Sequence, residues 1–248
     1  MESTLKRIAR RLLAKVPWIY LFVLKTFHRG SVEKYFYLSI VQQGDVVIDV
    51  GANVGYFTML FADLTGKRGQ VHAFEPIPST FEELLRNIRR FPGYKGVYLN
   101  CAAVGDSQRR TAMLLPRDDH GQAALVRHQD GSWKDAADQV RSIDVQMIRF
   151  DDYAASLGRI DFIKCDVEGA ELLFLRGAES TLRRCRPRLS LEMDERWMKS
   201  FGWSAIDVFQ LLRQIGYAHF YHVGPETKPI VEECFSGGEV LCCWKDRE

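Results

Sequence analysis

The sequence lacks both a strong excess of one charge and an apolar run long enough to cross a membrane. Its 248 residues have a formal net charge of +2, which does not favour nucleic acid as a partner. No stretch reaches the roughly 18 consecutive apolar residues of a membrane span, so we expect no transmembrane helix. The length suits one α/β domain with at most an appendage, and the apolar fraction of 46% is ordinary for a globular protein.

The six cysteines form no Cys-x-x-Cys pair and no spacing typical of a metal centre. They stand at positions 101, 165, 185, 234, 242 and 243, several of them inside apolar runs. This pattern favours free thiols in a reducing compartment. We therefore expect a cytoplasmic protein, while the N-terminal segment leaves peripheral contact with a membrane open.

Residues 1–30 differ in composition from the rest and are predicted to be a basic amphipathic appendage to a domain at 31–248. Apolar and basic side chains between residues 5 and 16 fall on opposite faces of a helix. The apolar run at 16–24 is broken by Pro17 and is too short to span a bilayer, and no small-residue cleavage site follows it. Residues 1–24 could lie in a membrane interface. Alternatively, they pack on the domain or on a second subunit of a homo-oligomer.

Short apolar strands alternate with helical segments along the rest of the chain. Runs rich in Val, Ile and Leu predict strands at 46–50, 70–74, 97–103, 160–165, 188–191, 217–222 and 240–244. Helices are predicted at 31–43, 56–64, from Pro78-Ser79 to about 90, at 150–157, after Glu171, and at 204–215, with Ser79 and Ser204 as caps. Segments 111–115 and 140–148 have the pattern of extra strands, on either side of a polar loop at 117–139. This order predicts an α/β fold with a doubly wound, mostly parallel sheet and one antiparallel strand near its edge.

Polar residues stand at or near the ends of five predicted strands. Because the carboxyl ends of parallel strands meet at one edge of a sheet, a ligand site is expected there. The five residues are Asp49, Glu75, Asn100, Asp166 and Glu192.

The turn after the first strand has the pattern Gly51-x-Asn53-x-Gly55, in which glycine lets a ligand approach the backbone. It differs from the Gly-x-Gly-x-x-Gly turn that binds a pyrophosphate. Asp49 directly precedes this turn, disfavours an anion and suits a cationic ligand. Glu75 ends the second strand, where an acid commonly accepts hydrogen bonds from ribose hydroxyls. S-adenosylmethionine, a nucleoside with a positive sulfur, fits both acids; the alternatives are that Asp49 caps the turn and that Glu75 is a surface acid.

Four segments of the chain together resemble one known family. They are Val47-Ile-Asp-Val-Gly-Ala-Asn-Val-Gly-Tyr-Phe-Thr58, His72-Ala-Phe-Glu-Pro76, Asn100-Cys-Ala-Ala-Val-Gly-Asp106 and Ile160-Asp-Phe-Ile-Lys-Cys-Asp-Val-Glu-Gly-Ala-Glu171. The chain is similar, over about residues 40–245, to the FkbM-type family of S-adenosylmethionine-dependent methyltransferases.

The resemblance implies a class I methyltransferase fold, which is Rossmann-like. It also implies methylation of a hydroxyl on a sugar, glycan, glycolipid or secondary metabolite. Asn100 and the Asp166 segment would flank the cofactor, and Cys165 stands where an aliphatic residue is usual. The residues that would hold the cofactor are Asp49, Gly51, Asn53, Gly55, Tyr56 and Glu75.

A hydroxyl acceptor must lose its proton, and a nearby carboxylate can take it as a general base. Asp166 is the first candidate for this role and Glu168 the second. Glu171 is expected on the same helix face as Glu168, or as an acid at the helix N-terminus. A divalent metal held by Asp166 and Glu192 is conceivable but not favoured, because two carboxylates alone are weak evidence. The loop histidines His120 and His128 could also act as a base, although a solvated position is the simpler interpretation.

Two further classes of function stay open. A nicotinamide-dependent oxidoreductase is disfavoured, because the pyrophosphate glycines are absent and Asp49 would repel phosphate. A non-catalytic protein that binds a membrane surface or a partner with a vestigial fold should have substitutions at the cofactor positions. None is seen at Asp49, Gly51, Gly55 or Glu75.

Overall fold

The computed structural model describes residues 32–91, 93–115, 124–126, 140–224 and 227–245. The N-terminal appendage, the loop histidines at 120 and 128, and most of the polar loop lie outside these ranges. Among the described residues, no helix has the length and apolar character needed to cross a membrane. All six cysteines are described, and each is a free thiol.

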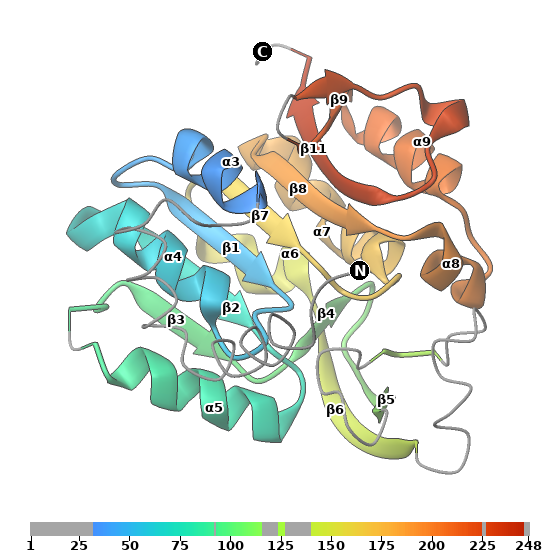
Figure 1. Ribbon diagram of the computed structural model, residues 1–248. Coiled ribbons are helices and arrows are strands. Elements are labelled where there is room, and N and C mark those ends of the chain that lie inside the picture. Colours follow the sequence, from blue (N-terminus) through green and yellow to red (C-terminus); the bar gives the residue numbers. More distant parts are fainter. Residues whose placement is uncertain (1–31, 92, 116–123, 127–139, 225–226, 246–248) are drawn as a thin grey trace, which may run out of the picture.

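An eight-stranded sheet forms the centre of the domain, in the order β10-β9-β11-β8-β7-β1-β2-β3 (Figure 1). The five strands from β8 to β3 run parallel, and β11 is antiparallel to both β8 and β9. The predicted mostly parallel sheet with an antiparallel strand near its edge is thus confirmed. The strands are β1 (Val46–Val50), β2 (Gln70–Phe74), β3 (Val97–Asn100), β7 (Phe162–Cys165), β8 (Arg188–Met193), β9 (Tyr217–His222), β10 (Lys228–Pro229) and β11 (Gly238–Trp244).

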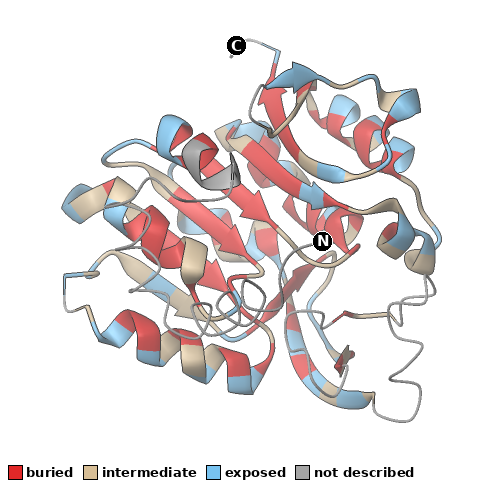
Figure 2. Cartoon of the chain, viewed as in Figure 1, coloured by how far each residue is buried: buried red, intermediate tan, exposed pale blue. Residues whose placement is uncertain are grey.

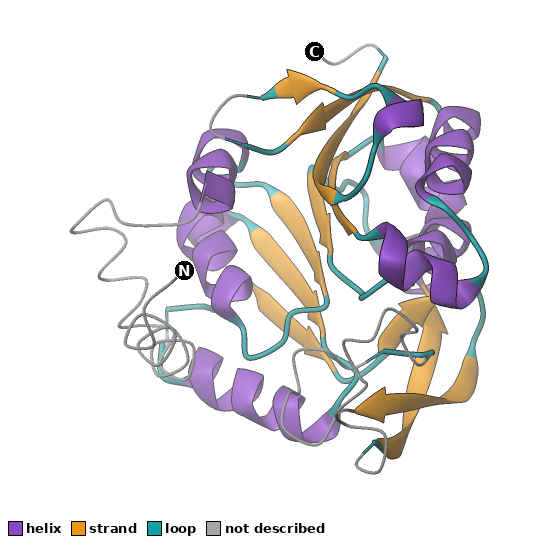
Figure 3. Ribbon diagram, turned by 45° about the vertical axis from the view of Figure 1, so that its right-hand side comes forward, coloured by secondary structure: helices purple, strands orange, loops and turns teal. Residues whose placement is uncertain are grey.

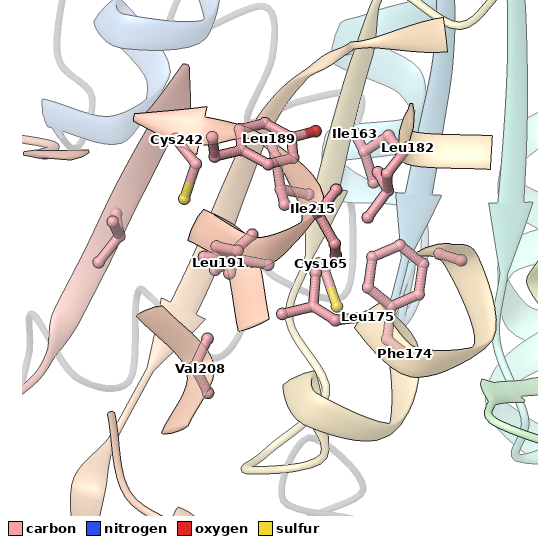
Figure 4. Packing of buried hydrophobic residues seen from close by; sticks show 14 of the residues in the cluster. Ile163, Cys165, Phe174, Leu175, Leu182, Leu189, Leu191, Val208, Ile215 and Cys242 are labelled. Atoms are coloured by element: carbon pink, nitrogen blue, oxygen red, sulfur yellow. The ribbon is translucent and has the colours of Figure 1, made fainter. Parts of the chain in front are cut away.

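Helices cover both faces of this sheet, as the doubly wound pattern requires. On one face, α3 (Val32–Ile40), α4 (Tyr56–Thr65) and α5 (Pro78–Arg89) share an apolar cluster with β1 and β2. On the other face, α6 (Phe150–Tyr153), α7 (Glu171–Cys185) and α9 (Ala205–Ile215) pack on the second cluster, part of which Figure 4 shows. The central strands are therefore buried on both sides, which explains their unalternated apolar sequences (Figure 2).

A second, three-stranded sheet stands apart from the first (Figure 3). It consists of β4 (Ala103–Gly105), β6 (Arg141–Arg149) and β5 (Arg109–Leu115), with β5 and β6 antiparallel. Both extra strands expected from the sequence are confirmed, but the single strand predicted at 97–103 is wrong. The chain leaves the main sheet after Asn100 and enters the small one at Ala103, so one apolar run supplies two strands.

Two predicted helix caps have different outcomes. Ser204 forms a capping box with Asp207 at the start of α9, as expected. Ser79 is not a cap, because α5 already begins at Pro78, and Ile77, with no side-chain hydrogen bond, precedes it. Proline is well suited to the first turn of a helix, where its missing N–H would have no intrahelical partner. The remaining short helices are η1 (Gly66–Arg68), η3 (Ala154–Ser156), α8 (Glu195–Met198), η4 (Lys199–Phe201) and η5 (Glu232–Cys234).

Candidate active site

A pocket of about 830 Å³, part of it open to solvent, lies at the carboxyl ends of β1, β2, β7 and β8. The small sheet contributes Val104 and Met113 to its wall, together with Leu125. The strand-end prediction therefore located the pocket. The expected site residues that line it are Gly51, Asn53, Glu75, Asp166, Glu168 and Glu192.

The turn after β1 is held tightly between two other strands. The backbone N–H groups of Gly51 and Ala52 both donate to the carbonyl oxygen of Phe74, at 3.0 and 2.9 Å. Gly51 has φ +82°, and a Cβ placed on it would lie 1.9 Å from the carbonyl oxygen of Asp166. Asn53 is also left-handed, at φ +49°. Only glycine at position 51 lets the turn pass this close to the end of β7.

Glu75 is almost fully buried at the end of β2, and its carboxylate faces the pocket. It accepts hydrogen bonds from the backbone N–H groups of Asn53, at 3.0 Å, and Ile77, at 2.9 Å. Burial raises its pKa to about 7, against the lowering effect of these two hydrogen bonds. Each carboxylate oxygen can still accept a second hydrogen bond. A ligand with hydroxyl donors would therefore stabilise the charged form, and this favours the ribose interpretation over that of a surface acid.

Asp49 is completely buried behind the pocket and does not line it. Its Oδ2 accepts a hydrogen bond from the Thr58 hydroxyl of α4 at 2.6 Å, whereas Oδ1 has no hydrogen-bond partner among the described residues. Burial raises the pKa of this carboxyl, while Lys164 and Thr58 oppose the shift. The hydrogen bond to α4 differs from the turn cap considered from the sequence. Oδ1 of Asp49 therefore keeps an unused acceptor position inside the protein.

Lys164 is a site residue that the sequence analysis missed. It lies within β7, is buried, and its Nζ is 2.9 Å from Oδ2 of Asp166 and 4.9 Å from the centre of the Phe57 ring. Burial lowers its pKa, but the carboxylates of Asp166 and Asp49 raise it more, so the net shift is upward. A signal was present, because a lysine two residues before a strand-end acid shares that acid's face of the sheet.

Asp166 and Glu192 lie side by side at the carboxyl ends of two adjacent parallel strands. Cys165 of β7 pairs with Leu191 of β8, so the next residue of each strand reaches the same edge. Their carboxyl groups are therefore neighbours at this edge of the sheet. Partial desolvation, followed by the negative charge of Asp166, raises the pKa of Glu192 to about 8. This carboxyl pair was expected only as a weak metal site.

The segment after β7 corrects the expected position of Glu168. Helix α7 begins at Glu171, and Glu168 lies before it in a left-handed conformation with φ +53°, so the two acids do not share a helix face. Gly169, at φ +95°, lies against the backbone of Trp197, and its carbonyl accepts a hydrogen bond from the Trp203 indole at 3.0 Å. These contacts hold Glu168 in the pocket lining, in a conformation that few non-glycine residues adopt.

Glu171 is the buried acid at the start of α7. Of the two positions expected for it, the one at the helix N-terminus is confirmed. It is fully buried, and its Oε1 accepts a hydrogen bond from the N–H of Gly169 at 3.1 Å. Its Oε2 has no partner among the described residues, and burial raises its pKa to about 8. Glu171 does not line the pocket, so its local role is in the turn before the helix.

Besides Asp49, three more residues expected at the cofactor do not line the pocket. The side-chain amide of Asn100 donates to the carbonyl of Ala73 at 3.1 Å and to the Tyr153 hydroxyl at 3.3 Å. Gly55, at φ +93°, packs against Leu84 of α5. Tyr56 begins α4 and contacts the Phe57 ring. Their roles toward a cofactor stay predictions, and the structure gives each of them a supporting contact behind the turn.

The described residues offer no complete set of ligands for the divalent metal considered from the sequence. Among the described residues, no group of three or more His, Cys, Asp or Glu side chains is placed to hold a metal ion. One oxygen of Asp166 faces the ammonium of Lys164 instead. His72, within β2, contacts the Tyr153 hydroxyl at 2.7 Å and Gln70 at 3.2 Å, so both of its ring nitrogens have partners.

The parallel sheet, the glycine turn and the acid-lined pocket define a Rossmann-like domain of the S-adenosylmethionine-dependent methyltransferase class. Comparison with known families agrees, since the family model described as "Methyltransferase FkbM domain" matches residues 49–218. The chain belongs to the FkbM methyltransferase family.

Curated relatives of moderate sequence identity support this family assignment. The chain is 31% identical to "31-O-demethyl-FK506 methyltransferase FkbM" of Streptomyces tacrolimicus, over 56% of this chain and 61% of that one. It is 27% identical to "Methyltransferase 1" of Beauveria bassiana, over 54% and 58%. The chain thus spans about three-fifths of the length of these curated relatives. A crystal structure of an FkbM methyltransferase from Methylobacillus flagellatus KT has the same fold, with a TM-score of 0.50 and 16% identity over 84% of this chain and 50% of that one.

Proposed function

We propose that this protein uses S-adenosylmethionine to methylate a hydroxyl of a sugar, glycan, glycolipid or secondary metabolite. The main observation in support is the turn after β1. At Gly51 a Cβ would collide with the Asp166 carbonyl, and the backbone of this turn is open to a ligand in the pocket. Family membership and the "O-demethyl" acceptor in the name of one relative support oxygen as the methylated atom.

The residues around the pocket fit a cationic nucleoside. Asn53 and Glu75 line its β2 side, where the raised pKa of Glu75 suits a partner that donates hydrogen bonds. Oδ1 of Asp49, which has no hydrogen-bond partner among the described residues, is buried behind the turn and would reach a charged amine only through a bridging water. In this proposal Gly55, Tyr56 and Asn100 support the turn and the adjoining strand end. A pyrophosphate would meet several carboxylates, which disfavours the nicotinamide alternative.

When bound, S-adenosylmethionine supplies the methyl group: the acceptor oxygen forms the new bond to carbon, the carbon–sulfur bond breaks, and its electron pair stays on sulfur. The chain has to align the acceptor and accept the hydroxyl proton. Asp166 and Glu168, both in the pocket lining, are the residues proposed from the sequence to provide that base. Membrane contact through residues 1–24, homo-oligomerisation and a cytoplasmic location stay predictions from the sequence.

Isothermal titration calorimetry with S-adenosylmethionine and with its demethylated product, S-adenosylhomocysteine, tests the cofactor site. Both should bind the full chain, and Glu75→Ala should weaken them about tenfold or more, since hydrogen bonds to a charged group contribute about 1.5–3 kcal/mol each. Glu82→Ala, an exposed acid on α5, is the matched control and should bind like the wild type. Equal affinity in the Glu75 variant would remove Glu75 from the site, and no binding by the wild type would refute the proposed function.

A further inference from the structure

Glu192 is the second-last residue of β8, lines the pocket and has a solvent-accessible side chain. On one side, its neighbour is Asp166, directly after the end of β7. On the other side, it pairs in register with Glu239 of β11, so these two side chains share a face of the sheet. Glu192 therefore stands between two other acids, in the pocket rather than behind it.

The charges around Glu192 are unevenly balanced. Lys164, the buried cation on this face, contacts Asp166 at 2.9 Å. Glu239 accepts a hydrogen bond from the Ser190 hydroxyl at 2.6 Å and another from the Tyr37 hydroxyl of α3. Both neighbours of Glu192 thus have partners that stabilise their charged forms, whereas a negative charge on Glu192 is opposed by two like charges.

Without a cationic ligand in the pocket, Asp166 and Glu192 can therefore retain one proton between them. The pKa of about 8 for Glu192 reflects desolvation first, then Asp166, with Lys164 acting in the opposite direction and Glu239 adding to the rise. The raised pKa of Glu192 favours its protonated form near neutral pH, and a protonated carboxyl cannot accept a proton from an acceptor hydroxyl. A positive charge placed in the pocket would favour the ionised form and release that proton.

We infer that Glu192 is the general base of this site, and that the positive sulfur of the bound methyl donor arms it by displacing its proton. Resting on the proposed function, the inference gives Asp166 a positioning role, because Asp166 is paired with Lys164 and is the neighbour of Glu192 at the strand ends. During methyl transfer, the proton of the acceptor hydroxyl passes to a carboxylate oxygen of Glu192, and the acceptor oxygen keeps the electrons of that O–H bond. Glu192 returns to its protonated form when the cation is consumed.

Proton release on binding can be measured without knowing the acceptor. Calorimetry of the full chain at pH 7, in EDTA-containing buffers of different ionisation enthalpy, gives the number of protons released per ligand bound. S-adenosylhomocysteine has the same amine and carboxylate but an uncharged sulfur, so the difference between the two ligands isolates the effect of the sulfonium. We expect S-adenosylmethionine to release about half a proton more, or greater. Near pH 9.5 the difference should disappear, because Glu192 is then ionised before binding.

Glu192→Gln should abolish the difference between the ligands while both still bind. Glu195→Gln, the same change on α8 outside the pocket lining, is the matched control and should keep it. The inference is overturned if the two ligands release equal numbers of protons, or if the difference persists in Glu192→Gln. If Glu192→Gln does not fold, the wild-type pH series decides, and a difference unchanged from pH 7 to 9.5 overturns the inference. If neither ligand binds, the proposed function itself is refuted. This outcome differs from failure of the Glu192 inference, in which both ligands bind but release equal numbers of protons.

Discussion

Replacing Gly51 by alanine perturbs the closest backbone approach in the site. The added Cβ would lie 1.9 Å from the carbonyl oxygen of Asp166, whereas real Cβ contacts are essentially never shorter than 3.0 Å. The turn after β1 and the end of β7 must therefore separate by about 1 Å or more. Because the two strands pair in register from Val47 to Val50, this movement distorts the strand ends that carry the pocket.

Two costs combine in Gly51→Ala. An L-residue held in the left-handed region costs about 1–2 kcal/mol, and forced overpacking costs typically about 1–3 kcal/mol. The variant should therefore lose roughly 2–5 kcal/mol of unfolding free energy in urea titrations. Its affinity for S-adenosylmethionine should fall by about tenfold or more, because the Asp166 edge of the pocket moves.

Gly44→Ala provides the matched control for this experiment. Gly44 is equally left-handed, at φ +92°, but a Cβ on it meets nothing within 4 Å. It should lose only the conformational cost of about 1–2 kcal/mol and keep its cofactor affinity. Equal losses of stability and unchanged binding in both variants would refute the argument that position 51 requires glycine for the approach to Asp166.

Two other substitutions test buried features outside the pocket. Burial raises the pKa of Glu171 from 4.5 to about 8, so its protonation stabilises the fold fully below about pH 4.5, and this contribution is lost as pH rises through 8. Glu171→Gln should thus gain stability relative to the wild type between pH 5 and 8 in urea titrations, and parallel pH curves would contradict this. Gly177→Ala should destabilise the domain by about 1–3 kcal/mol, despite alanine's helix propensity, because its Cβ would lie 1.8 Å from the Gly105 carbonyl. Gly158→Ala, with open space around it, is the control, and similar midpoints would oppose the expectation.

The sequence alone predicted most strands of the main sheet, though not β10, and the edge that carries the pocket. Unalternated apolar runs identified β1, β2 and β7, because strands buried on both faces need apolar side chains on both. The split between β3 and β4 was invisible, since both strands consist mostly of apolar residues and only two residues separate them. What ends β3 is the pairing of β4 with β6, a partner more than 35 residues away along the chain.

The site was predicted at the level of the strand ends and less well at the level of individual contacts. Glu75 and Asp166 were recognisable because an acid after an apolar run has few structural uses. Lys164 was hidden by its place inside an apolar strand, and its partners Asp49 and Asp166 come together only when β1 and β7 pair. Asn100 looked equivalent to the strand-end acids, but Tyr153, which its amide contacts, lies 53 residues further on.

The small sheet has a consequence for engineering this domain. Strands β5 and β6 pair with each other, and β6 pairs with β4, so their ladder is independent of the main sheet. Met113 of β5 nevertheless forms part of the pocket wall. A β5–β6 hairpin exchanged between homologous domains would therefore alter one wall of the pocket while the register of β1, β2, β7 and β8 stays intact.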